Sequence, residues 1–249
     1  SVYNVAVGKN AGFAITTGIS NTLVGALAGD ALTDADYNVA IGREALTTDT
    51  LGSRSVAIGN HALQVQNFTT ATNAYNVAVG YDAGVAVTTG QVNTLVGGLS
   101  GDALTTGGEN TAIGYKTLSA NTTGAYNTAL GSRALANFNV TTSAGTYNVA
   151  VGYNAGNDVT TGVNNTLVGG TTGQALTTGG NNVAMGYGAL YTDDVGSHSV
   201  AIGVSALQNQ NTATAASVYN TAVGSQAGLS MTTGKDNTLI GGLTGDALL

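Results

Sequence analysis

The chain has 249 residues, of which 8% are charged, 38 are glycine and none is proline, cysteine or tryptophan. A net charge of -7 leaves no basic stripe for neutralising phosphates, which argues against nucleic acid as a partner. The lack of cysteine removes disulfide and thiolate chemistry, and no apolar run approaches the ~18 to 20 residues of a membrane span, so we expect no membrane insertion in this segment.

The first element is the pentad Asn4-Val5-Ala6-Val7-Gly8, and pentads of the form Asn-(Val/Thr)-(Ala/Leu)-(aliphatic)-Gly recur along the whole chain. Their glycines are separated by 17, 17, 17 and then 21 residues, and this order repeats, so the super-repeat has 72 residues. The pentad glycines are Gly8, Gly25, Gly42, Gly59, Gly80, Gly97, Gly114, Gly131, Gly152, Gly169, Gly186, Gly203, Gly224 and Gly241. We predict a single repeat domain over residues 1–249. Its super-repeats are approximately 4–75, 76–147 and 148–219, followed by a partial one at 220–249.

Each pentad predicts a β-strand, because it alternates, is rich in β-branched residues and is bounded by Gly, Thr and Asn. A strand every 17 to 21 residues leaves too little chain for a helical crossover, whereas one coil with two short strands and two turns fits that length. The sequence therefore predicts an all-β fold, a parallel β-solenoid (β-roll) of about 14 rungs.

The position before each pentad glycine is always aliphatic, as in Val7, Val24 and Ile41, and we expect this column to point into the coil. The opposite face then carries the small Ala or Leu position and the glycine, which predicts cover by another chain. The asparagine that opens most pentads, replaced by Ser55 and Ser199, predicts a ladder of stacked side-chain hydrogen bonds.

Three runs carry a resemblance to a known group of proteins. They are Asn110-Thr111-Ala112-Ile113-Gly114-Tyr115-Lys116-Thr117-Leu118, Ser55-Val56-Ala57-Ile58-Gly59-Asn60-His61-Ala62-Leu63 and Asn127-Thr128-Ala129-Leu130-Gly131-Ser132-Arg133-Ala134-Leu135. They resemble the repeats of trimeric autotransporter adhesin heads and of bacteriophage tail fibres. The resemblance implies a left-handed roll in a homotrimer, exposed on a cell surface or virion and serving attachment. The rungs here are longer than those of the adhesin heads, which leaves the cross-section of the rung open.

Two sets of residues are candidates for ligand contact. Every fourth rung is four residues longer, at 64–74, 136–146 and 208–218, and Phe68 and Phe138 lie in two of these extensions. Loops on one face of a solenoid often form its binding face. Tyrosines also follow four of the pentad glycines, at Tyr81, Tyr115, Tyr153 and Tyr187, where they could stack on a sugar or pack between chains.

Catalytic and metal-binding patterns are weak. His61 and His198 lack a nucleophile in a recognisable pattern and a repeated acidic partner. Calcium could be recruited by Asp34 with Asp36 or by Asp193 with Asp194, but no Gly-Gly-x-Gly-x-Asp run is present and solvated turns are the default interpretation. Asp30, Asp102 and Asp246 recur at one rung position. We expect no enzyme activity, no catalytic or metal-binding residues and no cofactor.

The sequence favours a non-catalytic structural and adhesive fibre, extracellular, on a cell surface or virion. Its expected partners are further copies of itself, side by side in a homotrimer and end to end along the fibre, and a glycan or receptor. The alternatives are a glycan-binding solenoid, an ice-binding solenoid suggested by pairs such as Thr16-Thr17 and Thr88-Thr89, and a polysaccharide-degrading tailspike. The scattered aspartates make the tailspike the weakest of these.

Overall fold

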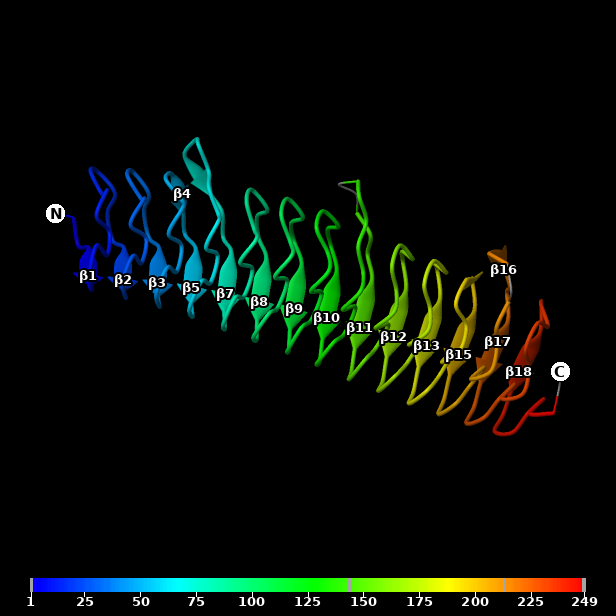
Figure 1. Ribbon diagram of the computed structural model, residues 1–249. Helices are drawn as coiled ribbons and strands as arrows, with labels where there is room; N and C mark the ends of the chain where they lie inside the picture. The colour runs from blue at the N-terminus through cyan, green and yellow to red at the C-terminus, as the bar shows by residue number, and fades with distance from the viewer. Residues whose placement is uncertain (1, 143–144, 213, 248–249) are drawn as a thin grey trace. The chain divides into compact units, whose positions relative to one another are not determined.

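The computed structural model describes residues 2–142, 145–212 and 214–247. Over these residues it contains strands and turns and no helix, and it forms a parallel β-solenoid of about 14 turns (Figure 1). The strands are β1 (Val5–Val7), β2 (Thr22–Val24), β3 (Val39–Ile41), β4 (Gly52–Ser53), β5 (Val56–Ile58), β6 (Thr72–Asn73), β7 (Val77–Val79), β8 (Thr94–Val96), β9 (Thr111–Ile113), β10 (Thr128–Leu130), β11 (Val149–Val151), β12 (Thr166–Val168), β13 (Val183–Met185), β14 (Gly196–Ser197), β15 (Val200–Ile202), β16 (Ala216–Ser217), β17 (Thr221–Val223) and β18 (Thr238–Ile240).

The chain divides into two compact units, residues 1–125 with 141–144 and residues 126–140 with 145–249. In unit 1 the main strands stack in the order β1-β2-β3-β5-β7-β8-β9, and in unit 2 in the order β10-β11-β12-β13-β15-β17-β18. Neighbouring pentads pair in parallel without any shift, so that Val7 lies beside Val24 and Val24 beside Ile41. The predicted stacking of equivalent positions is therefore confirmed within each unit.

Most coils contain one strand, whereas the sequence predicted two. A second strand occurs in the pair β4 and β6 in unit 1 and in the pair β14 and β16 in unit 2. Elsewhere in the described chain the coil returns through turns, which use a left-handed backbone at many residues other than glycine, such as Leu27 and Leu46. These turns still place the backbone of one coil on the next through hydrogen bonds such as Thr33 N–H to the Thr50 carbonyl at 3.0 Å.

The pentad glycine recurs because the coils approach each other closely there. Gly59 has a φ of +140°, and a Cβ at this residue would lie 2.2 Å from the Gly80 carbonyl oxygen of the next coil. The same close approach occurs at Gly25, where the Gly42 oxygen would be 2.4 Å away. Any side chain at this position would both strain the backbone and separate the coils.

The asparagine column forms the predicted ladder. The Asn21 N–H donates to Asn4 Oδ1 at 2.8 Å, and the Asn38 N–H donates to Asn21 Oδ1 at 2.9 Å. The side-chain amide of Asn21 in turn donates to the Ala35 carbonyl at 2.7 Å. Since Asn21 and Asn38 are fully buried, their side chains satisfy backbone groups that water cannot reach.

The strand faces the opposite way from the prediction. Its central residue, Ala or Leu, points into the coil and is buried in every main strand except β1. The aliphatic residue before the glycine points outward instead, and Ile41 and Ile113 are 37% and 38% exposed. The reason is the narrow interior of the coil, where leucines from the turns already fill the space opposite the central alanine, as Leu46 does.

The four-rung pattern follows from how the coils share this interior. Where the strand centre is Leu23, the turns of its own coil and of the preceding coil carry Gly29 and Gly12, and a Cβ at either would lie 2.9 or 2.8 Å from the Leu23 methyl groups. Where the strand centre is Ala40, the turn carries the buried Leu46. Strand and turn thus supply the large side chain alternately, which keeps the core filled without overlap.

Candidate functional surface

The outer face of the sheet is an apolar surface that the rest of the chain leaves uncovered. It is formed by the first and third residues of each main strand, and we call these two rows the outer columns. The third residues are aliphatic throughout, and several are well exposed, including Leu130 at 38% and Met185 at 40%. Only 8% of the residues in the chain are charged, so few charges interrupt this face. The first residue of each main strand is valine or threonine, so the aliphatic column lies beside a mixed one. Exposed apolar surface of this kind is typical of an interaction site.

Exposed tyrosines flank the outer columns in sequence. One group precedes the pentads and includes Tyr126 and Tyr147, whose rings stack with centroids 5.2 Å apart and an interplanar angle of 6°. Tyr37 also precedes a pentad, and the Arg54 guanidinium lies over its ring, with the central carbon 4.9 Å from the ring centroid. These side chains extend the apolar face by aromatic surface with polar edges.

The second group of tyrosines follows the pentad glycine, as the sequence predicted, and all four are exposed. Tyr81 and Tyr115 are 57% and 50% exposed in unit 1, and Tyr153 and Tyr187 are 57% and 65% exposed in unit 2. In each unit the two tyrosines lie two coils apart, and the coil between them carries glycine at the same position, Gly98 or Gly170. The tyrosines of this group are thus available for contact with a ligand or with another chain.

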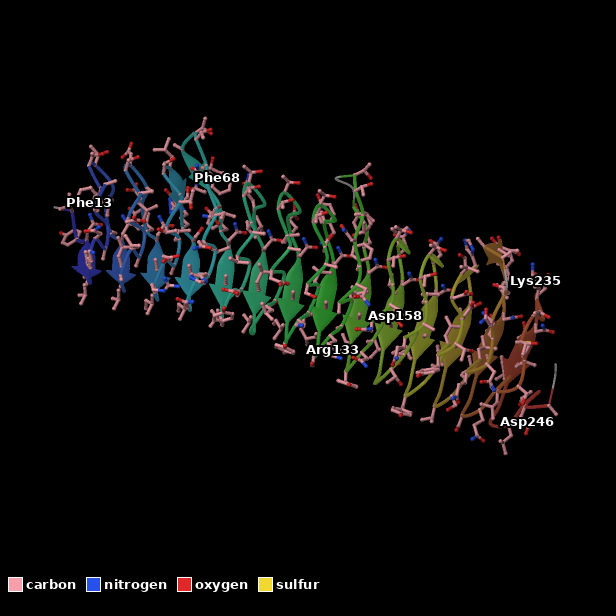
Figure 2. The ribbon with its side chains drawn as sticks, viewed as in Figure 1. Phe13, Phe68, Arg133, Asp158, Lys235 and Asp246 are labelled. Carbon is pink, nitrogen blue, oxygen red and sulfur yellow. The ribbon has the colours of Figure 1, made fainter. Side chains whose placement is uncertain are left out.

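The two phenylalanines predicted as ligand contacts lie inside the coils. Phe68, labelled in Figure 2, is 5% exposed, and Phe138 is fully buried, although both lie in extensions of the rung. Phe138 stands seven residues after its pentad glycine, the position of the buried Leu32 and Val87 in other coils, so its ring takes the place of their side chains. Neither ring offers exposed surface to a ligand, so these two residues are better described as core residues.

A polar network that the sequence did not predict holds the first extension. Asp49 and Gln66 are fully buried, and the Gln66 side-chain amide donates to Asp49 Oδ2 at 2.6 Å. The other carboxylate oxygen accepts the backbone N–H groups of Gly52 and Phe68, both at 3.0 Å. Gln66 Oε1 accepts a bond from the Asn76 side chain at 2.8 Å. We call this set of residues the polar lock, because its carboxylate joins a turn to the extension of the next coil.

Unit 2 contains a second polar lock with nearly the same geometry. The Gln210 amide donates to Asp193 Oδ2 at 2.5 Å, Gly196 N–H donates to Asp193 Oδ1 at 3.0 Å, and the Asn220 side chain donates to Gln210 Oε1 at 2.8 Å. In each lock the glutamine amide also donates to a serine hydroxyl at 3.1 Å, Gln66 to Ser55 and Gln210 to Ser199. These serines are the two that replace asparagine in the pentads, so the substitution makes room for the glutamine.

Burial dominates the electrostatics of both locks. It raises the pKa of the Asp49 carboxyl above its usual value of 3.8, although hydrogen bonds from Gln66, Phe68 and Gly52 act in the opposite direction. Burial raises the pKa of Asp193 in the same way, again against the effect of its hydrogen bonds. An Asp in this position is a structural group with a desolvation cost. The groups that contact the Asp49 carboxylate, from Gln66, Gly52 and Phe68, all donate hydrogen bonds to it.

His61 lies between two carboxylates, which the sequence did not indicate. Its Nδ1 is 2.9 Å from Asp82 Oδ1, and its Nε2 is 3.5 Å from Glu44 Oε2. The Arg43 guanidinium lies 2.7 Å from the same Nε2 and 2.6 Å from Glu44. Arg43 therefore occupies the place where a nucleophilic hydroxyl would stand in a catalytic triad, and the cluster forms a surface network of charges.

Four of the turn aspartates accept hydrogen bonds separately from one another. Asp34 accepts the Thr17 hydroxyl at 2.6 Å, Asp36 accepts the Ile19 N–H at 2.8 Å, and Asp30 accepts the Thr47 hydroxyl. Asp193 belongs to the polar lock of unit 2. In the part of the chain that the structure describes, no group of three or more His, Cys, Asp or Glu side chains is placed to hold a metal ion.

The threonine pairs form ladders along the turns. The hydroxyl of the first threonine donates to the main-chain carbonyl of the next coil, as from Thr16 to Thr33 at 3.2 Å and from Thr88 to Thr105 at 3.2 Å. The same bond joins Thr160 to Thr177. These hydroxyls are committed to the stacking of the coils, which weakens the case for a threonine row that binds ice.

Comparison of the chain with protein-family models, curated proteins and solved structures finds no match. The described residues include no helix that is long and apolar enough to cross a membrane. The class of protein is therefore defined by the fold itself, a repeat protein built as a parallel β-solenoid.

Proposed function

We propose that this chain is a structural and adhesive segment of a homotrimeric extracellular fibre, on a cell surface or virion, with no catalytic role. The observation that carries the proposal is the exposed apolar face formed by the outer columns, with residues such as Ile41 and Ile113 more than one third exposed. Exposing these side chains to water is unfavourable, and association with identical chains removes them from it.

The size of the face supports association between copies. Seven coils at ~4.8 Å each extend ~34 Å, and seven residues across the strand and its flanking tyrosines extend ~23 Å, so each unit offers ~800 Å². A stable interface buries about 800 Å² on each partner. The main-chain ladders supply a stiff support for such a face, since each coil is hydrogen-bonded to its neighbours.

The mass of the purified chain in solution tests the proposal. We expect about three times the 24.4 kDa of one chain by sedimentation equilibrium. The double substitution Ile41→Glu with Ile113→Glu places two charges on the outer columns and should give monomers. Thr89→Glu with Thr161→Glu introduces the same two charges at exposed turns and is the matched control, which should stay trimeric. A monomeric native chain at about 10 μM, well above the Kd that such an interface supports, would contradict the proposal.

A further inference from the structure

We propose that unit 2 contains a calcium site in the corner where the turn at Asp194 meets the extension of the next coil. The site consists of the Asp194 carboxylate, the hydroxyl and carbonyl oxygens of Thr212 and the side-chain oxygen of Asn211. The ligand is a divalent cation of the size of Ca²⁺, bound by oxygen atoms alone. The site belongs to one chain, so the inference goes beyond the proposed fibre and does not depend on the number of chains in it.

Unit 1 shows how the same corner is closed by a threonine. The Thr50 hydroxyl donates to Asn67 Oδ1 at 3.1 Å and is 3.0 Å from the Phe68 carbonyl oxygen, both on the extension of the next coil. A hydroxyl has a proton to place between its own oxygen and these acceptors. The corner of unit 1 is therefore held by hydrogen bonds and requires no further group.

In unit 2 a carboxylate replaces this hydroxyl. Asp194, Asn211 and Thr212 stand two super-repeats after the three residues of the unit 1 corner. The Thr212 backbone N–H still donates to Asp193, as the N–H at the equivalent position of unit 1 donates to its own polar lock, so the two corners are built alike. An ionised carboxylate only accepts hydrogen bonds. The substitution therefore brings an acceptor to a place where unit 1 uses a donor.

Two buried oxygen atoms of this corner have no hydrogen-bond partner. They are Asp194 Oδ1 and Thr212 Oγ1. Thr212 is only 4% exposed, so its hydroxyl cannot turn to bulk water instead. Buried polar atoms are nearly always paired, and an unpaired one points to a bound ion or water. Two oxygens that share a Ca²⁺ ion at ~2.4 Å lie about 3.4 to 4.8 Å apart, beyond the reach of a hydrogen bond to each other. A cation therefore accounts for both unpaired atoms at once.

The charge of the corner favours a cation over a water molecule. Asp193 and Asp194 are adjacent, and no Lys, Arg or His side chain in the described ranges forms an ion pair with either carboxylate. Burial and, to a smaller extent, the charge of Asp194 raise the pKa of Asp193, while its hydrogen bonds act in the opposite direction. A divalent cation removes this repulsion. Ca²⁺ accepts hydroxyl and carbonyl oxygens in an irregular arrangement, whereas Mg²⁺ demands a nearly ideal octahedron, so the corner suits calcium.

Equilibrium dialysis of the full chain against CaCl₂, with the ionic strength held constant by NaCl, tests the inference. We expect one calcium ion per chain with a Kd of about 0.1 to 1 mM, the range of sites with few charged ligands. Asp194→Thr restores the residue of unit 1 and should abolish binding, and Thr212→Val should weaken it at least ~10-fold by removing one ligand. Asp34→Thr makes the same change at an exposed turn and is the matched control, which should bind calcium like the native chain. Far-UV circular dichroism of each variant shows whether the coils remain folded.

Three outcomes would overturn the inference. The first is a native chain that binds no calcium at 10 mM CaCl₂, about 10-fold above the weakest expected Kd. The second is binding that survives Asp194→Thr or, if that variant is not folded, survives Thr212→Val. The third is an equal loss of binding in Asp34→Thr, which would show a general attraction of the ion to an acidic chain. None of these outcomes bears on the mass of the assembly, so failure of the calcium site is distinct from failure of the fibre.

Discussion

The turns at Asp49 and Asn121 occupy the same place in consecutive super-repeats, yet they satisfy their backbones differently. Asp49 accepts bonds from two backbone N–H groups and requires a third donor, Gln66, from the next coil. Asn121 closes on itself, since its Oδ1 accepts the Gly124 N–H at 2.9 Å and its amide donates to the Gly124 carbonyl at 2.9 Å. The position equivalent to Gln66 in the sequence is Phe138, which is buried in unit 2. The comparison shows that the buried carboxylate takes a side-chain donor from the following coil, whereas the amide of Asn121 closes its turn with Gly124 alone.

The largest effect is expected when the polar lock loses one partner. Gln66→Ala leaves the Asp49 carboxylate without its side-chain donor and the Asn76 amide without its acceptor, both in a buried site. We expect a loss of about 3 to 5 kcal/mol in the free energy of unfolding, measured by urea denaturation. Gln64→Ala is the matched control, because Gln64 is only half-buried and makes one bond to Glu44. Equal losses of unfolding free energy in Gln66→Ala and Gln64→Ala would contradict a stabilising role of the polar lock.

A smaller effect is expected when the lock is replaced by the pair found in the middle super-repeat. Asp49→Asn together with Gln66→Phe substitutes the residues that stand at positions 121 and 138. The amide can close the turn alone, and the phenyl ring can fill the space, so the double variant should be more stable than the sum of the two single changes predicts, by about 1 to 3 kcal/mol. A double-mutant cycle from urea midpoints measures this difference. If the changes in unfolding free energy of the two single variants simply add up in the double variant, the coupling between positions 49 and 66 is contradicted.

The smallest effect concerns pH. The pKa of Asp49 is raised in the folded chain, so its contribution to stability is fully present below its ordinary pKa of 3.8 and is lost as the pH rises through the folded value. Asp49→Asn should therefore flatten the decline in unfolding free energy above pH 3.8, by about 1.4 kcal/mol for each pKa unit of the shift. Melting temperatures between acid and neutral pH measure it. Asp34→Asn, at an exposed turn, is the control, and a decline of unchanged size in Asp49→Asn would contradict the assignment.

The solenoid and its columns could be predicted from the sequence, because a fixed spacing of identical pentads leaves few other folds. The direction in which the strand faces could not, because both of its faces are apolar and a period of two does not distinguish them. A different signal was present. In the second coil of each four the strand centre is leucine, as at Leu23 and Leu95, and the turn carries glycine. In the third and fourth coils the strand centre is alanine and the turn carries leucine. When a large side chain stands in either the strand or the turn but not in both, the two positions share the same core space.

The polar locks were missed for a similar reason, since a single aspartate in a turn is normally solvated. The signal was the recurrence of Asp49 with Gln66 exactly two super-repeats later as Asp193 with Gln210, each accompanied by serine in place of the pentad asparagine. The number of second strands was overestimated, because turns built on left-handed residues can carry the return of a coil without a strand. The prediction that Phe68 and Phe138 contact a ligand is wrong, because the length of an extension does not tell which of its side chains turn into the core.

The asparagine columns tie each coil to the one before it. At most steps the later coil donates its backbone N–H to a side-chain oxygen of the earlier one, as Asn21 does to Asn4 and Asn38 to Asn21. For these bonds each coil depends only on the coil before it, and about 17 residues form one step. We expect a folded coil to serve as the template for its neighbour, so that order spreads along the chain one coil at a time.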